Sequence, residues 1–319
     1  MPGARWKLFI LDNFIWIIDI LVYLAFAVYR PVMFSVSLIR WIIYASVPLA
    51  FLVFAESIIL ITGNIDLSIS GICSLSAMAT AALFIRHGHW GIFSFIPPIL
   101  IGICCGVING FLTVNLRINS FLSTLATSMI FTGGTLLISS YALYGCFPDY
   151  YLLLGGDEEV ALIFLITTLL ILWFILTRTQ LGSNLYSVGG NLLSSKMMGI
   201  STEKTIFYAF IMSGFLCGLA GIVYTGYLKS VPPSLASNVN LLPAIAAAVM
   251  GGVSLFGGRG SIVNAYGGTL LSTIITAGLV SLNVNVFVRQ MVFGVVIAIA
   301  VFINNVRERI RDKILAPRI

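Results

Sequence analysis

Apolar windows of about 20 residues recur along the whole chain, and each is long enough to cross the ~30 Å hydrocarbon core of a bilayer. Gly, Pro and charged residues mark most of the joints between these windows. The pattern predicts an all-α polytopic membrane protein, with residues 1–319 forming a single transmembrane domain. The ten expected spans are roughly 11–29, 41–62, 66–85, 93–115, 119–141, 160–177, 205–228, 239–257, 261–282 and 286–305.

Composition agrees with a membrane location. Of the 319 residues, 59% are hydrophobic and only 9% are charged, and the mean hydropathy is +1.07. Soluble domains carry roughly 25% charged residues, so most of this surface is expected to face lipid or other protein.

The basic residues are distributed unevenly between the two sides of the predicted bundle. Residues 142–159 form a long loop with four acidic residues and no Lys or Arg. The opposite side collects twelve of the seventeen basic residues: Arg5, Lys7, Arg117, Arg178, Lys196, Lys204, Arg259, Arg307, Arg309, Arg311, Lys313 and Arg318. The positive-inside rule then places both termini in the cytoplasm. The basic pI of about 9.1 is explained by this orientation, and no nucleic-acid partner is expected.

No catalytic constellation is apparent. The only histidines, His87 and His89, lie in one short turn without metal-binding spacing, and there is no Gly-x-Ser-x-Gly nucleophile motif. The five cysteines form no Cys-x-x-Cys pair. None of the five lysines follows a glycine, which excludes a phosphate-binding Walker A loop. The chain is therefore expected to be no enzyme, to hold no metal or cofactor, and to depend on another chain for any ATP it uses.

Acidic residues within the apolar windows are the next candidates, because a charge at a helix centre costs about 2.5–3.5 kcal/mol on insertion scales. Glu56 falls inside the second span and is expected to face the bundle interior, either as a packing residue or as a pathway residue. Asp66 lies in the segment "TGNIDLSIS", residues 62–70, which ends one helix and starts another. It can cap the new helix, and with Asn64 and Ser68 it can also line a path.

A second candidate is the cytoplasmic segment 178–204, which contains "LYSVGGNLLSSKMMGI". Gly189 and Gly190 are expected to turn the chain into one or two helical turns, which Gly199 ends. The apolar residues of this short helix include Leu193 and Met197. A membrane-surface helix is one interpretation, and a protein partner is the other; the helix is short for lipid binding alone.

A third candidate is "GGVSLFGGRGS", residues 251–261. Its glycines, Gly251, Gly252, Gly257 and Gly258, permit a tight turn and close helix approach, and Arg259 is expected at the cytoplasmic face.

These three motifs resemble those of permease subunits of ribose-type sugar ATP-binding-cassette (ABC) importers, in the same order and spacing. "TGNIDLSIS" is similar to that family's Gly-Gly-Ile-Asp-Leu-Ser-Val-Gly signature, with Asn64 and Ser70 where glycines are usual. The second motif resembles the family's coupling loop, with Ser183 where a basic residue is usual and Ser194-Ser195 where two alanines are. The third resembles its other glycine-rich loop.

The resemblance implies a fold related to vitamin B12-type importers, with inverted-repeat halves, in a prokaryotic cytoplasmic (inner) membrane. It implies a second permease copy or a sister permease, two ATPase subunits, and a periplasmic or lipoprotein substrate-binding protein. The ATPase contact would involve Gly189, Gly190, Asn191, Leu193, Met197 and Gly199, and the substrate path Glu56, Asn64, Asp66 and Ser68. Ribose or another monosaccharide is the expected substrate. A nucleoside or a furanosyl signalling molecule is an alternative, and a stand-alone secondary carrier is a further one.

Overall fold

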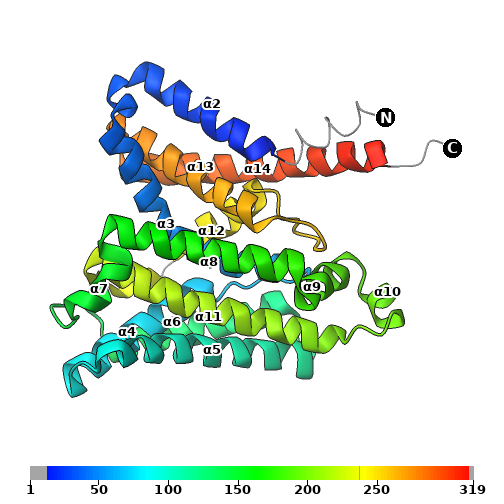
Figure 1. The fold of residues 1–319 in the computed structure, drawn as a ribbon, viewed down its shortest axis with the longest axis horizontal. Coiled ribbons are helices and arrows are strands. Elements are labelled where there is room, and N and C mark those ends of the chain that lie inside the picture. Colours follow the sequence, from blue (N-terminus) through cyan, green and yellow to red (C-terminus); the bar gives the residue numbers. More distant parts are fainter. Residues whose placement is uncertain (1–12, 237, 316–319) are drawn as a thin grey trace.

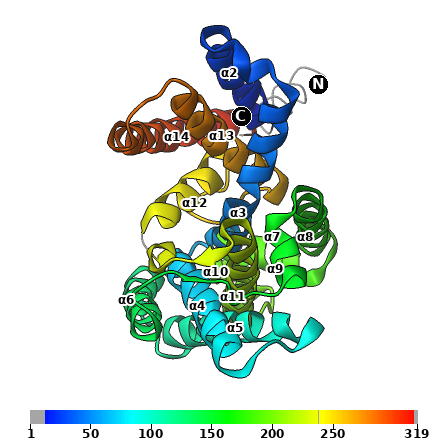
Figure 2. The same ribbon diagram turned by 90° about the vertical axis from the view of Figure 1, so that its left-hand side faces the viewer.

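The computed structural model describes residues 13–236 and 238–315, and its regular structure is almost entirely helical. Most long helices run along the long axis of the molecule (Figure 1), and α3 lies near the middle of the bundle (Figure 2). The α-helices are α2 (Phe14–Tyr29), α3 (Val36–Ile61), α4 (Ile69–His87), α5 (Ile96–Gly110), α6 (Ser120–Ile138), α7 (Asp149–Gly156), α8 (Glu158–Arg178), α9 (Gln180–Gly190), α10 (Leu192–Met197), α11 (Thr202–Leu228), α12 (Asn238–Met250), α13 (Ile262–Ser281) and α14 (Val286–Leu315). Shorter elements are the 3-10 turns η1 (Pro31–Phe34), η2 (Gly91–Phe95) and η4 (Pro233–Ala236), the π-helical turn η3 (Phe111–Asn115), and strands β1 (Leu143–Tyr144) and β2 (Ser230–Val231), which pair antiparallel.

The all-α polytopic architecture is confirmed. Seven helical segments within the described residues are long and apolar enough to cross a membrane, and three shorter apolar helices correspond to the remaining expected spans. The seven are Val36–Ile61, Ile69–His87, Gly91–Asn115, Ser120–Ile138, Glu158–Arg178, Thr202–Leu228 and Ile262–Ser281, and the shorter ones are Phe14–Tyr29, Leu241–Met250 and Val286–Val296.

Several boundaries differ from the sequence-based expectation. The predicted span 239–257 is too long, because α12 ends at Met250. There Gly251 packs so closely on α13 that an added Cβ would lie 2.3 Å from the carbonyl oxygen of Asn264, and Gly252 adopts a φ of +86°. The expected loop 142–159 contains α7, and segment 178–204 contains α9 as well as the short helix α10. Both α7 and α9 are too short to be recognised as separate apolar windows.

The core is built around α3, whose residues from Ala50 to Ile61 are fully buried. Against it packs α11, and small residues let α11 approach α5 closely. A Cβ added at Gly214 of α11 would lie 2.2 Å from the carbonyl oxygen of Gly102 of α5. This contact explains why two long apolar helices carry glycines at facing positions.

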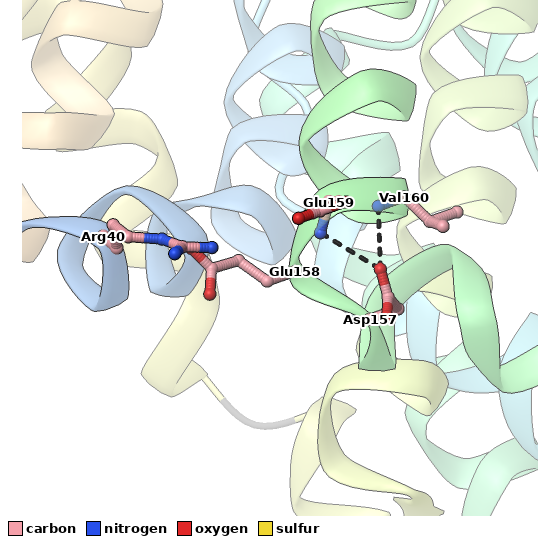
Figure 3. A network of polar contacts seen from close by, with 5 residues as sticks. All are labelled: Arg40, Asp157, Glu158, Glu159 and Val160. Atoms are coloured by element: carbon pink, nitrogen blue, oxygen red, sulfur yellow. Dashed lines mark hydrogen bonds and ion pairs between the residues drawn. The ribbon is translucent and has the colours of Figure 1, made fainter. Parts of the chain in front are cut away.

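The two ends of the bundle carry different structures. One end holds α7, the start of α8 and the start of α3, and the other holds α9, α10 and the far end of α14 (Figure 1). At the first end, Asp157 caps α8 by accepting from the amides of Glu159 and Val160 at 3.1 and 3.0 Å (Figure 3). The adjacent Glu158 pairs with Arg40 of α3 at 2.8 Å, which ties the starts of the two helices together.

Candidate functional site

The segment 62–68 is a buried break between α3 and α4. The helix α3 ends where Gly63 takes a φ of +77°, a conformation that favours glycine. Asp66 is 1% exposed and Ser68 is fully buried. Irregular backbone inside a membrane bundle needs internal hydrogen-bond partners, so the partners of this segment define the site.

Asp66 binds the backbone and side chain of one neighbour. Its Oδ1 accepts from the amide of Ser68 at 2.9 Å and from the Ser68 hydroxyl at 2.6 Å. The expectation that Asp66 caps α4 directly therefore needs correction. It lies ahead of the first helical residue, Ile69, and it fixes the turn that leads into α4.

From this turn a chain of hydrogen bonds crosses to three other helices. The hydroxyl of Ser213 (α11) donates to Asp66 Oδ2 at 3.3 Å. The amide of Asn109 (α5) donates to the Ser68 hydroxyl at 2.7 Å, and Asn109 in turn accepts from Thr127 (α6) at 2.7 Å. We refer to Asp66, Ser68, Asn109, Thr127 and Ser213 as the buried polar network.

Glu56 lies beside this network. It is fully buried, and its Oε1 accepts from the backbone amide of Asp66 at 3.5 Å, while its Oε2 has no hydrogen-bond partner in the described part of the chain. The structure thus brings Glu56, Asp66 and Ser68 together. The amide side chain of Asn64 donates instead to the hydroxyl of Thr62 at 3.0 Å.

The backbone of the break is also held by α6. The amide of Leu67 donates to the Thr124 hydroxyl at 3.0 Å, and the amide of Ile65 donates to the Ser120 hydroxyl at 3.4 Å. These contacts give the otherwise orphaned amides of the break their partners. One face of α6 therefore serves as a polar support for residues 65–67.

The three glycine-containing motifs meet at the far end of α3. A Cβ added at Gly189 would lie 1.8 Å from the carbonyl oxygen of Ile61, and one added at Gly257 would lie 2.7 Å from both Gly189 O and Gly63 N. These approaches are too close for any side chain. We call Gly63, Gly189, Gly190, Gly257 and Gly258 the glycine junction.

A backbone hydrogen bond stabilises the glycine junction. The amide of Gly258 donates to the carbonyl oxygen of Ile61 at 2.8 Å, which supplies a partner near the end of α3. The hydroxyl of Tyr186 in α9 donates to the carbonyl oxygen of Gly260 at 2.9 Å. Burial raises the pKa of Tyr186, so this hydroxyl stays protonated as a donor.

The roles expected for Gly189 and Gly190 need correction. Both residues lie at the end of α9 without positive φ, so they do not turn the chain. The lack of a side chain at Gly189 instead allows the close approach of Ile61 and Gly258, whereas a Cβ at Gly190 would lie 4.0 Å from the Cα of Gly258. Gly199 has a φ of +78° after α10, as expected for a helix exit.

Asn191 connects α9 to α10. It has an extended backbone, and its Oδ1 accepts from the amide of Ser194 at 2.8 Å, which makes it the N-cap of α10. Its position in the motif is thus explained by helix initiation. The helix that it starts spans Leu192–Met197 and matches the expected one or two turns.

The surface of α10 is apolar and exposed. Leu193 is 66% exposed and Met197 81% exposed, and Phe256 in the third motif is 77% exposed. Arg259 is also exposed at this end. We call Leu192, Leu193, Met197 and Met198 the α10 patch; a surface of this kind typically marks a contact with a partner.

Sequence reasoning missed Asn109, Thr127 and Ser213. Each is a small polar residue within a predicted apolar span, and hydroxyl residues are common in such spans. Asn109 gives a weak signal of a polar contact, because an amide inside a membrane helix needs a hydrogen-bond partner. Asn109 is also followed directly by Gly110. The partner itself lies in another helix and cannot be read from spacing.

Comparison with known proteins decides the family. The family model described as branched-chain amino acid transport system / permease component matches residues 38–301. The chain belongs to this permease family. It is 36% identical over 253 residues to the D-allose transport system permease protein of Escherichia coli (strain K12), covering 78% of this chain and 77% of that protein.

Other relatives extend the comparison. The permease is 33% identical over 257 residues to the ribose import permease protein of Bacillus subtilis (strain 168), covering 79% of each chain. It is 30% identical over 291 residues to the autoinducer 2 import system permease protein of Photorhabdus luminescens, covering 89% of this chain and 87% of that one. No solved structure matches the chain. The permease is thus a multi-pass transport subunit of an ABC importer and not an enzyme.

Proposed function

We propose that this permease forms the translocation path for a monosaccharide and is driven by ATPase subunits that dock on the α10 patch. The glycine junction is the main structural support for this proposal. It packs the end of α9, the end of α3 and the loop 251–261 against one another without intervening side chains. A displacement of α10 would therefore be transmitted to the break at Asp66 through backbone contacts alone.

Charge distribution supports an orientation with α9 and α10 in the cytoplasm. That end carries Arg178, Lys196, Lys204 and Arg259, whereas the expected acidic outer loop holds α7 and the cap of α8. Both termini would then be cytoplasmic, in the inner membrane of a prokaryote, with residues 1–319 as one transmembrane domain. A substrate-binding protein would meet the α7 end.

The buried polar network suits a gating role more than tight substrate binding. Its hydrogen bonds join segments of α5, α6 and α11 to the α3–α4 break, so a movement of the break would change contacts in each. In this proposal Glu56, Asp66 and Ser68 set the conformation of the path. Asn64, which follows Gly63 of the glycine junction and bonds to Thr62, is not part of this group.

The substrate class follows from the relatives. Two of them have names that refer to D-allose and ribose, which favours a monosaccharide. The longest of the three alignments described above is to an autoinducer 2 permease, which favours a furanosyl signalling molecule as the second candidate. Two permease copies, or this chain and a sister permease, would enclose the path.

The docking proposal is tested by Met197→Asp in the complete transporter. Met197 is 81% exposed, so the substitution should not disturb folding, but it places a charge in an apolar contact. We expect normal insertion, loss of ATPase co-purification and loss of ATP-dependent uptake. Met197→Leu keeps the apolar surface and is the matched control, expected to behave as wild type. Full co-purification and uptake with Met197→Asp would contradict the assignment of α10.

A further inference from the structure

A groove at the α7 end of the bundle lies apart from the buried polar network. It has a volume of about 700 Å³ and lies between α3, α11, α12, α13 and α14. This is within the roughly 300–1,000 Å³ typical of small-molecule sites. Its residues come from the starts of α3, α12 and α14 and the later parts of α11 and α13, the end opposite the α10 patch.

The lining combines aromatic residues with hydrogen-bonding groups. Trp41 and Tyr227 contribute aromatic surface, and Thr276 and Gln290 contribute a hydroxyl and an amide. Monosaccharides present both apolar C–H surfaces and many hydroxyls, so they need both kinds of contact. An apolar wall with a few placed polar groups is the usual composition of a small-molecule site.

Two polar groups of the groove have no hydrogen-bond partner among the described residues. The hydroxyl of Ser272, a residue that is 2% exposed, and Nε of Arg289 are buried and make no hydrogen bond within the described residues. Buried polar groups are nearly always paired, so these two groups on one lining could be satisfied by a ligand that binds in the groove. One group is an N–H donor and the other a hydroxyl that donates and accepts, which matches the hydroxyls of a sugar.

The lining offers mostly uncharged hydrogen-bonding groups. Among the described residues, the lining has one cation, Arg289, and no carboxylate, and its other polar groups are neutral hydroxyls, one amide and the indole N–H of Trp41. Guanidinium N–H groups donate readily to neutral oxygen acceptors. We propose that this groove is a binding station for a neutral monosaccharide, held by Ser272, Arg289 and Gln290 against Trp41 and Tyr227. The proposal rests on monosaccharide import and locates where the sugar first binds the permease.

Occupancy can be measured without transport by thiol protection. Leu242 lines the groove and is 55% exposed, so Leu242→Cys on an otherwise cysteine-free permease should react with a water-soluble maleimide. D-ribose or D-allose in the millimolar range should slow this reaction. With Ser272→Ala or Arg289→Gln added, half-protection should need about three- to tenfold more sugar, the effect of one lost hydrogen bond.

Matched controls lie outside the groove. Ser74 in α4 is also fully buried with an unpartnered hydroxyl, so Ser74→Ala removes the same group elsewhere. Arg86, near the end of α4, provides Arg86→Gln. Neither should change protection. In the complete transporter, Ser272→Ala and Arg289→Gln should lower the initial uptake rate several-fold, while the two controls should not.

The outcomes separate the two proposals. If the unmodified transporter takes up a monosaccharide but that sugar gives no protection, or if Ser272→Ala matches Ser74→Ala, the groove assignment is wrong and monosaccharide import stands. Protection by ribose 5-phosphate and not by ribose would overturn the neutral-sugar assignment. Failure of the unmodified transporter to take up any monosaccharide would remove the proposed function and this inference with it.

Discussion

The buried polar network and the glycine junction are joined by the short segment from Ile61 to Asp66, yet they are held together in opposite ways. Around Asp66, side chains from three other helices form hydrogen bonds with the side chains of Asp66 and Ser68 and with one another. At Gly189, backbone meets backbone because side chains are absent. We therefore expect the first region to respond to substitution in a graded way, whereas the second should not tolerate a side chain at its closest contact, Gly189.

The largest effect is expected from Gly189→Ala. The new methyl group would lie 1.8 Å from the carbonyl oxygen of Ile61, which is backbone and cannot move aside alone. We expect destabilisation of at least about 1–3 kcal/mol, with reduced folded yield and loss of uptake. Yield after size-exclusion chromatography and thermal unfolding would measure it.

The control is the next residue in the same helix. A Cβ at Gly190 would lie 4.0 Å from the Cα of Gly258, so Gly190→Ala adds the same group without a close contact. Near-wild-type yield is expected for this variant. Equal behaviour of the two alanine variants would show that the close approach at Gly189 is absent.

Asp66 should show the graded response. Asp66→Asn keeps an acceptor oxygen for Ser68 and should fold well, since Asp and Asn serve such turns about equally. Asp66→Ala leaves the buried amide and hydroxyl of Ser68 without their acceptor, which costs about 1–3 kcal/mol. If the charge itself serves transport, uptake by Asp66→Asn should fall while its thermal stability stays near wild type. Well-folded Asp66→Ala with normal uptake would contradict both roles.

The smallest effect is expected at the exposed end of the bundle, from Arg40→Gln. Arg40 pairs with Glu158 at 2.8 Å in a solvent-accessible position (Figure 3), and exposed ion pairs contribute little to stability. Thermal unfolding should be almost unchanged at physiological salt. A loss of stability as large as that of Asp66→Ala would show that this pair is more than a surface contact.

Much of the architecture could be predicted from the sequence, because hydropathy acts locally. Each of the ten apolar windows corresponds to a helix, since a run of apolar residues must hydrogen-bond its own backbone in a bilayer. The predicted ends of the last and third-last spans were wrong by several residues. The end of α12 depends on the packing of Gly251 against α13, and α14 continues beyond its apolar part.

The candidate sites could be predicted only as separate motifs. The sequence pattern drew attention to segments 62–70, 178–204 and 251–261, but the meeting of Gly63, Gly189 and Gly257 depends on contacts between residues far apart in the chain. The partners Asn109, Thr127 and Ser213 were missed for the same reason. In the sequence, a hydroxyl residue of an apolar helix gives the same pattern whatever its partner is. Thr80 bonds to the backbone of its own helix, whereas Ser213 bonds to Asp66 in another segment.

The central claim is that three motifs distant in sequence form one junction, and the most direct test is a cross-link across it. A Cβ at Gly63 would lie 3.5 Å from the carbonyl oxygen of Phe256, so Asn64→Cys and Phe256→Cys on a cysteine-free background should be close enough for a short bifunctional maleimide. After cleavage in the 142–159 segment, the two fragments of the folded permease should remain joined, and those of either single-cysteine variant should separate. Complete separation of the double-cysteine fragments, with both thiols shown to react singly, would contradict the junction.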